Sequence, residues 1–296
     1  MVIRRQAADK TVQYLLFVVA LSSITVLLLI GIFLFWEGLP ILKFTSWRDF
    51  LFGSLWYPTD DDPLFGIFPL IAGSAAVTLL SSLISVPLGI MTAIYIAEIA
   101  GKRTAELVKP FVEILASLPS VVIGLFGLVV FSPFLQKVFH VPIGINLFNA
   151  SLMLAFMAVP TICSISEDAI HSVPGSLREA SLALGATHLE TIIKIVLPAS
   201  ASGIATAVIL GMSRAIGETM VVLMVAGGAA VVPTSLFDPV RPMPSTIAAE
   251  MAEAPFRSGH YHALFAIGIV LFVFTLLFNL TADVMADRFK KRQLGG

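Results

Sequence analysis

The sequence has 296 residues, of which 57% are hydrophobic and only 12% are charged, and its net charge is −1. Soluble domains carry about 25% charged residues, so this composition excludes an ordinary soluble domain and indicates a membrane protein. No basic run occurs outside the C-terminal tail, which argues against a nucleic-acid partner. The single cysteine, Cys163, cannot form an internal disulfide.

The apolar residues are gathered in six long stretches. A helix needs about 20 apolar residues to cross a hydrocarbon core of roughly 30 Å. The stretches that meet this length with few charges are 13–36, 68–98, 111–134, 147–166, 200–226 and 262–284. The first is too long for the apolar part of a signal peptide, so we expect a retained span. The sequence therefore predicts an all-α integral membrane protein with six transmembrane helices.

The distribution of Lys and Arg predicts the orientation. If the N-terminus lies inside, the outer side carries only Lys43, Arg48, Lys137, Arg241 and Arg257. The remaining basic residues, apart from Arg214 within a span, lie on the inner side. By the positive-inside rule, both termini are expected in the cytoplasm.

Two long segments, 37–67 and 227–261, lie on the outer side in this topology. Their flanking aromatic residues are expected to anchor at the membrane interface: Trp36, Trp47, Trp56 and Tyr57. The acidic turn at 60–62 lacks the alternating ligands and distal Glu of a calcium loop. His260 and His262 alone make a poor metal site, so we predict no metal.

Prolines interrupt the apolar stretches at Pro87, Pro119 and Pro160. A proline removes one helix hydrogen bond and kinks the helix, which membrane proteins tolerate where neighbours satisfy the freed carbonyl. The kinks are either static or gating hinges, and the sequence leaves both interpretations open.

The fifth stretch contains two charges, Arg214 and Glu218. A charge at the centre of a span costs about 2.5–3.5 kcal/mol, so such residues are functional candidates. At a spacing of i, i+4 they share one helix face and are expected to neutralise each other. Small residues continue the same stripe, which should face protein or a pathway: Ser200, Gly203, Ala207 and Gly211. The alternative is an ion pair that serves helix packing alone.

The inner loop before this stretch predicts a helix, a corner and a second helix. Residues 179–184 are helical in pattern, and Gly185 follows as a suitable C-terminal cap, with an expected positive φ. The second helix leads to Pro198. This exposed elbow is suited to a groove on a cytoplasmic partner. The sequence has no phosphate-binding loop and no protease or hydrolase motif, so we predict no enzyme and no cofactor.

The elbow resembles the E-A-A-x3-G-x9-I-x-L-P loop of binding-protein-dependent ABC import permeases. The matching residues are Glu179, Ala180, Gly185, Ile195, Leu197 and Pro198, and Ser181 replaces the second Ala. Within that family, the string Arg-Ala-Ile-Gly-Glu-Thr at 214–219 is similar to the signature of the phosphate-specific permeases. Residues 65–73, 118–127 and 220–228 resemble the C-type subunit more than the A-type.

The resemblance implies a type I importer fold. A five-helix core, 68–284, would contain the coupling loop 171–199. Segment 1–67 would add a first helix that wraps a partner, and 285–296 would be a basic cytoplasmic tail. The implied partners are an A-type permease, two ATPase subunits and a periplasmic phosphate-binding protein in the bacterial inner membrane.

The resemblance also assigns roles to residues. The substrate path would include Gly211, Arg214, Glu218 and Thr219. ATPase coupling would use Glu179, Ala180, Ser181, Gly185, Ile195 and Pro198. The remaining alternatives are a permease for another oxyanion such as molybdate or sulfate, the A-type phosphate permease, and an ATP-independent anion transporter, although no internal inverted repeat supports the last.

Overall fold

The computed structural model describes the backbone of residues 2–293 and the side chains of residues 10, 12–282 and 284. The side chains of the basic tail expected at 285–296 lie outside the described residues. The same holds for Arg4 and Arg5, two of the basic residues expected on the inner side.

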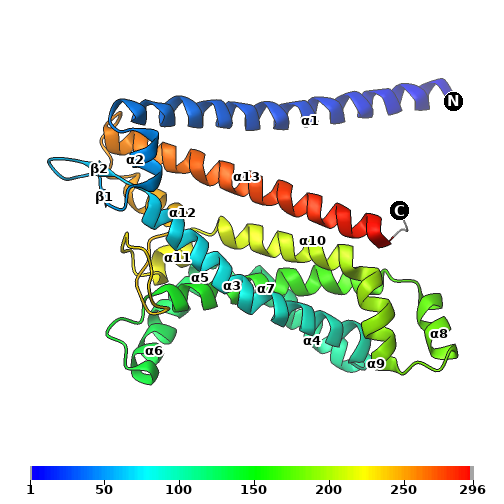
Figure 1. Cartoon of the computed structure of the whole chain (residues 1–296). Helices are drawn as coiled ribbons and strands as arrows, with labels where there is room; N and C mark the ends of the chain where they lie inside the picture. The colour runs from blue at the N-terminus through cyan, green and yellow to red at the C-terminus, as the bar shows by residue number, and fades with distance from the viewer. Residues whose placement is uncertain (1, 294–296) are drawn as a thin grey trace.

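The described chain is almost entirely helical (Figure 1). The first part consists of α1 (Val2–Gly38), the 3-10 turn η1 (Leu39–Lys43), α2 (Trp47–Phe52), the antiparallel strands β1 (Trp56–Tyr57) and β2 (Leu64–Phe65), α3 (Phe68–Ile94) and the π-helical turn η2 (Tyr95–Ile99). The middle part consists of α4 (Lys102–Ser117), α5 (Ser120–Phe126), the π-helical turn η3 (Gly127–Phe131), α6 (Ser132–Phe139) and α7 (Leu147–His171). The last part consists of α8 (Gly175–Ala183), α9 (His188–Thr191), the π-helical turn η4 (Ile192–Val196), α10 (Leu197–Ile216), α11 (Met220–Val225), α12 (Met243–Glu250) and α13 (Gly259–Gln293).

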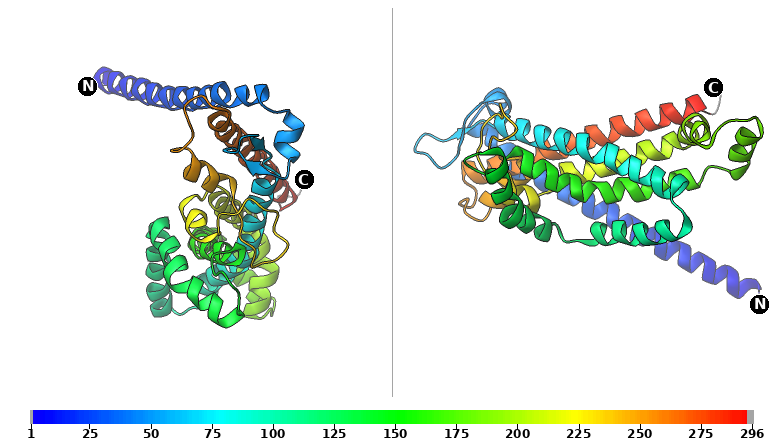
Figure 2. Two further views of the ribbon diagram at one scale, coloured as in Figure 1. Left: turned by 90° about the vertical axis from the view of Figure 1, so that its left-hand side faces the viewer. Right: turned by 90° about the horizontal axis from the view of Figure 1, so that it is seen from below.

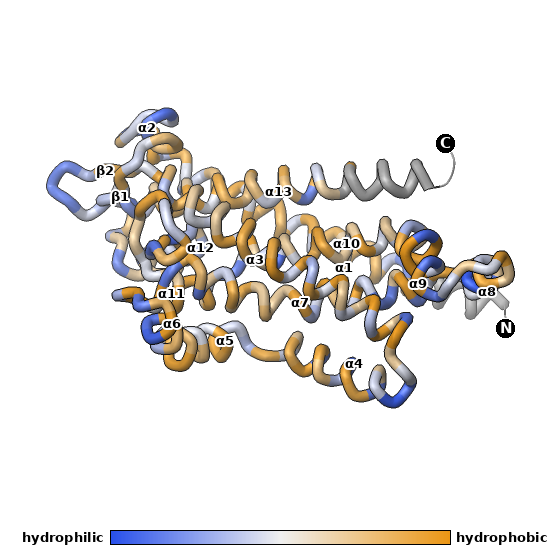
Figure 3. Tube along the Cα trace, turned by 60° about the horizontal axis from the view of Figure 1, so that its bottom comes forward, coloured by the Kyte–Doolittle hydropathy of each residue, from blue (hydrophilic) through white to orange (hydrophobic). Residues whose placement is uncertain are grey.

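Six helical segments of the described chain are long and apolar enough to cross a membrane, as the sequence predicted. They are Val12–Lys43, Phe68–Ile99, Ser120–Phe139, Leu147–His171, His188–Ile216 and Gly259–Ala282. Apolar residues follow the long helices, while hydrophilic residues gather in the β1–β2 loop and around α8 and α9 (Figure 3).

Two predicted spans have the wrong boundaries. The span expected at 111–134 is broken, because Leu118 and Pro119 are extended, with ψ of 131° and 136°, between α4 and α5. Proline lacks an N–H, and the residue before it avoids the helical region. The span expected at 200–226 ends at Ile216, and a new short helix, α11, begins at Met220. Pro87 and Pro160, by contrast, lie inside continuous helices.

The helix α7 lies at the centre of the bundle, and its contacts with α3 and with α10 are the most extensive between helices of the described chain. Glycines allow this close approach. A Cβ on Gly89 of α3 would lie 2.8 Å from Ile162 of α7, and a Cβ on Gly211 of α10 would lie 2.5 Å from the same side chain. Ser200 and Ala207 are also buried, so the small residues of the predicted stripe do face protein.

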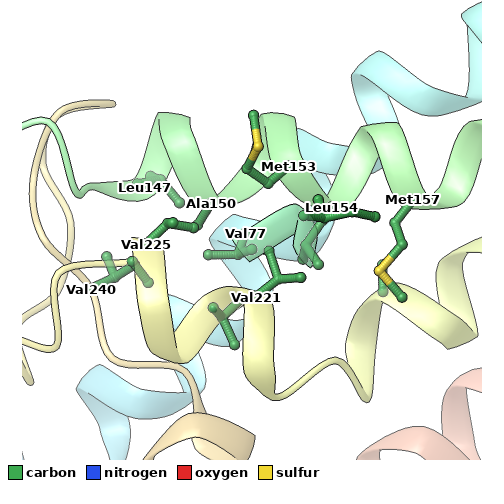
Figure 4. Close-up of a cluster of buried hydrophobic side chains, with 13 residues drawn as sticks. Val77, Leu147, Ala150, Met153, Leu154, Met157, Val221, Val225 and Val240 are labelled. Carbon is green, nitrogen blue, oxygen red and sulfur yellow. The ribbon is translucent and has the colours of Figure 1, made fainter. Parts of the chain in front are cut away.

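The short helix α11 packs back against α5 and α7. Its Val221 and Val225 enter a buried apolar cluster with Val77 of α3 and Met153 and Leu154 of α7 (Figure 4). This packing holds the end of the broken fifth span inside the bundle.

The first helix has few neighbours. Phe33 and Gly38 of α1 pack on α13, whereas the N-terminal half separates from the bundle (Figure 2). The described side chains from Val12 to Leu29 are exposed. Both chain ends lie at the same end of the bundle as α8 and α9, opposite the β1–β2 hairpin (Figure 1).

Trp56 is not an interface anchor, contrary to the sequence-based expectation. Its side chain is 3% exposed, and its indole Nε1 donates to Glu250 of α12 at 3.1 Å. An indole in a protein interior needs such an acceptor. Trp36 and Tyr57, in contrast, are exposed.

Candidate translocation path and coupling elbow

Arg214 lies in the last turn of α10 and is exposed on the surface of the isolated chain. Its Nη1 donates to the hydroxyl Oγ1 of Thr161 on α7 at 3.2 Å. A cation near the C-terminal end of a helix is also favoured by the helix dipole. The guanidinium is therefore fixed at one edge and leaves its other donors free for a ligand.

Arg214 and Glu218, both described in full, form no ion pair, so the predicted mutual neutralisation is wrong. The i, i+4 geometry fails because α10 ends between the two residues. The Oε1 atom of Glu218 instead accepts from the backbone N–H groups of Met220 at 3.1 Å and Val221 at 3.4 Å. These N–H groups have no partner within the helix, so the carboxylate caps the start of α11.

The other two predicted path residues lie beside this break. Thr219 is half-buried, and its hydroxyl donates to the carbonyl of Gly217 at 3.3 Å. Gly211 is buried one turn before Arg214 and contacts α7 through Ile162. Gly211 therefore determines how closely α10 approaches α7 at the level of Arg214.

Sequence reasoning missed two polar neighbours of this region. Thr161 follows Pro160 in an apolar helix. The one sequence feature that could have pointed to it is a hydroxyl group within a predicted membrane span. Ser213, the residue before Arg214, donates to Oδ1 of Asn279 on α13 at 2.6 Å. Through these two bonds the end of α10 is joined to helices on both sides.

The elbow has the form that the sequence predicted. After α8, Gly185 adopts a φ of +86°, its N–H donates to the Leu182 carbonyl, and the Ala186 N–H donates to the Ser181 carbonyl. This is a Schellman motif, which satisfies the last carbonyls of α8. Thr187 and Glu190 form a reciprocal capping box at the start of α9. The corner is thus specified on both sides.

The predicted coupling residues differ in exposure. Glu179, Ala180, Gly185 and Pro198 are exposed, whereas Ser181 and Ile195 are half-buried. Ser181 is within hydrogen-bonding distance of the Thr191 hydroxyl, 2.9 Å away, and so links α8 to α9. Leu184, at the corner, is 90% exposed, and Leu182 and Leu189 beside it are also exposed. The elbow therefore presents an apolar surface that none of the described residues covers.

At the end of the bundle opposite the elbow, Glu250 of α12 joins several loop segments. Its carboxylate accepts from Trp56, pairs with Arg241 and lies 2.9 Å from His260 Nε2. These residues line an open cavity of about 490 Å³ that also contains Glu253. His262, two residues from His260, instead contacts the backbone carbonyl of Glu37 through Nδ1, so the two histidines do not converge.

Asp238 organises the loop that precedes Arg241. Its carboxylate accepts from the backbone N–H groups of Thr234 at 2.7 Å and Ser235 at 2.8 Å. These bonds, followed by that of the Thr234 hydroxyl, hold the pKa of Asp238 below its ordinary value. The carbonyl of Asp238 in turn accepts from the Leu147 N–H at the start of α7.

Solved structures similar to this chain include two ABC transporters. The alginate importer permease aligns with a TM-score of 0.65 and 17% identity over 96% of this chain and 99% of that chain. The MetNI methionine transporter, in an inward-facing conformation, aligns with a TM-score of 0.57 and 21% identity over 76% and 94%. These likenesses show the type I importer permease fold.

Sequence relatives cover most of the chain. The probable ABC transporter permease protein YqgH of Bacillus subtilis is 41% identical over 92% of this chain and 88% of its own length. The phosphate transport system permease protein PstC of Mesorhizobium japonicum is 35% identical over 92% and 88%, and that of Pasteurella multocida is 33% identical over 85% and 86%. A family model described as a binding-protein-dependent transport system inner membrane component matches residues 85–294. The chain therefore belongs to this family of ABC importer permeases, which are transport components and not themselves enzymes.

Proposed function

We propose that this chain is the C-type permease subunit of an ATP-driven importer of inorganic phosphate. Relatives named PstC are 31–35% identical over most of the chain. The string at 214–219 supports the same substrate. YqgH, which is more similar, is named only as an ABC permease, so the substrate is the part of the proposal that most needs a test.

The observation that carries the proposal is the position of Arg214. It is an exposed guanidinium on a membrane-crossing helix, held at one edge by Thr161. Such a charge is retained in a membrane only where it has a role. The planar fork of arginine bonds an oxyanion at two points and stays charged at all physiological pH values. Glu218 and Thr219 lie at the break between α10 and α11. Together with Gly211 they complete the proposed path.

The exposed surfaces suit the proposed partners. Between Tyr14 and Ile30, α1 exposes almost only apolar side chains around the helix, which fits a helix that wraps an A-type permease. The apolar elbow around Leu184 fits a groove on one of two ATPase subunits. The outer cavity around Glu250 lies on the end that a periplasmic phosphate-binding protein would approach.

The proposed location is the bacterial inner membrane, with both termini in the cytoplasm. Cysteine labelling in intact cells tests this topology, because the native Cys163 is buried. A cysteine at the exposed Asp61 should react from outside, and one at the exposed Thr187 only after the membrane is opened. Labelling of the second position from outside contradicts the topology.

Transport in proteoliposomes tests the substrate. The chain, its permease and ATPase partners and the binding protein are reconstituted, and uptake of phosphate, molybdate and sulfate is compared with and without ATP. We expect ATP-dependent uptake of phosphate alone. Uptake of another oxyanion in its place, or uptake that does not require ATP, contradicts the proposal.

A further inference from the structure

Arg178, the residue before the coupling residue Glu179, joins the elbow to the membrane bundle. Its side chain is 23% exposed, whereas most of α8 around it is open to solvent. Its partner Glu98, in the turn η2 at the end of α3, has a side chain that is 7% exposed. This is the one ion pair, among the residues that the structure describes, between α8 and another helix.

The guanidinium makes bonds to two helices at once. Nη2 and Nε donate to Oε1 of Glu98 at 2.7 and 3.2 Å. Nη2 also donates to the Ile170 carbonyl at 2.9 Å, and Nη1 donates to the Val173 carbonyl. Carbonyls at the end of a helix have no partner within it, so Arg178 closes the end of α7 and binds α3 through the same group.

Only arginine supplies this combination of bonds. Its donors are fixed in a plane, whereas a lysine ammonium is a flexible point charge. Loss of Arg178 would leave the carboxylate of Glu98 nearly buried without its partner, which is strongly unfavourable. The contact is therefore a mostly buried ion pair with several hydrogen bonds, and not an exposed surface pair.

The elbow is held together by its own hydrogen bonds. The Schellman motif, the capping box and the Ser181–Thr191 contact link α8 to α9 internally. The chain connects this unit to α7 on one side and to α10 on the other. It has no covalent connection to α3, so Arg178 supplies the link to the third central helix.

We propose that the Arg178–Glu98 pair is a positioning contact that makes α3 follow the elbow when the ATPase subunits move. The three central helices, which meet at Ile162, then move together and change the surroundings of Arg214. The inference rests on the proposed coupling role of the elbow, and its test separates the two.

The first measurement follows movement and does not depend on the substrate. Spin labels are placed on Met91→Cys, exposed on α3, and Leu184→Cys on the elbow, in a Cys163→Ala background of the assembled complex. We expect a narrow label distance that is the same with and without ATP. In Arg178→Gln, ATP should shift or broaden it. A distance that changes in the parent complex, or that stays fixed in Arg178→Gln, overturns the proposal.

The second measurement follows coupling through charge reversal. We expect Arg178→Glu and Glu98→Arg each to lower phosphate uptake per ATP hydrolysed by about tenfold or more. The double reversal should recover only part of the loss, because it restores the ion pair but a carboxylate at position 178 cannot donate to the carbonyls of Ile170 and Val173. Lys194→Gln is the matched control, because it removes an exposed pair within the elbow, between Lys194 and Glu190, that reaches no other helix. Normal coupling in both single variants, or lost complex without any rescue, contradicts a positioning role.

Cross-linking of Leu184→Cys to the ATPase subunit separates failure of the Arg178–Glu98 pair from failure of the elbow. If the cross-link forms and coupling is normal in Arg178→Glu, the positioning role of the Arg178–Glu98 pair is rejected. The coupling role of the elbow is then unaffected. Absence of the cross-link in the parent complex rejects the elbow itself.

Discussion

Thr161 of α7 holds Arg214 of α10 through a hydrogen bond of 3.2 Å between its hydroxyl and the guanidinium. The residue that sequence spacing assigned as the partner of Arg214, Glu218, binds backbone N–H groups of the next helix instead. The charge in the membrane is thus oriented by a neutral group. Arg214 makes no ion pair with a described residue, which is what the proposed anion contact requires.

The hydroxyl of Thr161 is the first test of this arrangement. Thr161→Val has nearly the same shape but cannot accept the bond, whereas Thr161→Ser retains it. A hydrogen bond to a charged group contributes about 1.5–3 kcal/mol, so we expect phosphate uptake in Thr161→Val to fall by roughly tenfold or more. Thr161→Ser is the matched control and should remain near the parent value. Equal uptake in the two variants would show that the hydroxyl does not position Arg214.

Glu218 is expected to act as a cap for α11. Glu218→Gln keeps an oxygen that can accept from Met220 and Val221, so assembly and thermal stability should change little. Glu218→Ala removes the acceptor and should lower stability by about 0.5–2 kcal/mol, the usual cost of losing a helix cap. The comparison is made by thermal unfolding of the purified complex. If Glu218→Gln is as damaging as Glu218→Ala, the negative charge, and not the cap, is what matters.

Gly211 is expected to be essential for the approach of α10 to α7. A Cβ there would lie 2.5 Å from Ile162, so Gly211→Ala should lower stability by about 1–3 kcal/mol through overpacking. Shortening the neighbour in the double variant Gly211→Ala, Ile162→Val should recover part of the loss. Gly31→Ala, where no atom lies within 4 Å of the added Cβ, is the control. An unchanged unfolding temperature in Gly211→Ala would mean that the helices have room to separate.

Gly185 tests the corner of the elbow by its backbone alone. Nothing lies within 4 Å of a Cβ at Gly185 or at Gly175, but only Gly185 has a positive φ, of +86°. A left-handed conformation costs a residue with a Cβ roughly 1–2 kcal/mol. Gly185→Val should therefore reduce ATPase docking and uptake while the protein still inserts, and Gly175→Val should do neither. Normal complex recovery and uptake in Gly185→Val would exclude the corner as a transmission point.

The sequence predicted the elements that depend on local patterns. Six apolar stretches, the cap at Gly185 and the small-residue face of α10 each follow from residues close together in the chain. The break after Ile216 was not predicted, because Gly217 and Glu218 sit in an apolar run whose hydropathy alone indicates one continuous span. The cap that ends it depends on a side-chain bond that composition does not reveal.

The sequence also did not predict contacts between residues that lie far apart in the chain. Trp56 and Glu250 are 194 positions apart, and Arg178 and Glu98 are 80 apart. The sequence around Trp56 does not distinguish a buried tryptophan from one at the membrane interface. The sequence around Arg178 does not distinguish an arginine that pairs with another helix from a solvated one. Only the packing of the helices brings these partners together.

The central claim is that Arg214 contacts the transported anion. The direct measurement is phosphate uptake by the reconstituted complex with Arg214→Gln and with the double variant Arg214→Met, Glu218→Leu, and with recovery of all subunits checked in parallel. Removal of a charge from a span eases insertion, so both variants should insert and Arg214→Gln should assemble fully. We predict complexes that are assembled but inactive in both cases. Restored uptake in the double variant would contradict the account, because transport would then proceed without the guanidinium that is proposed to contact the anion.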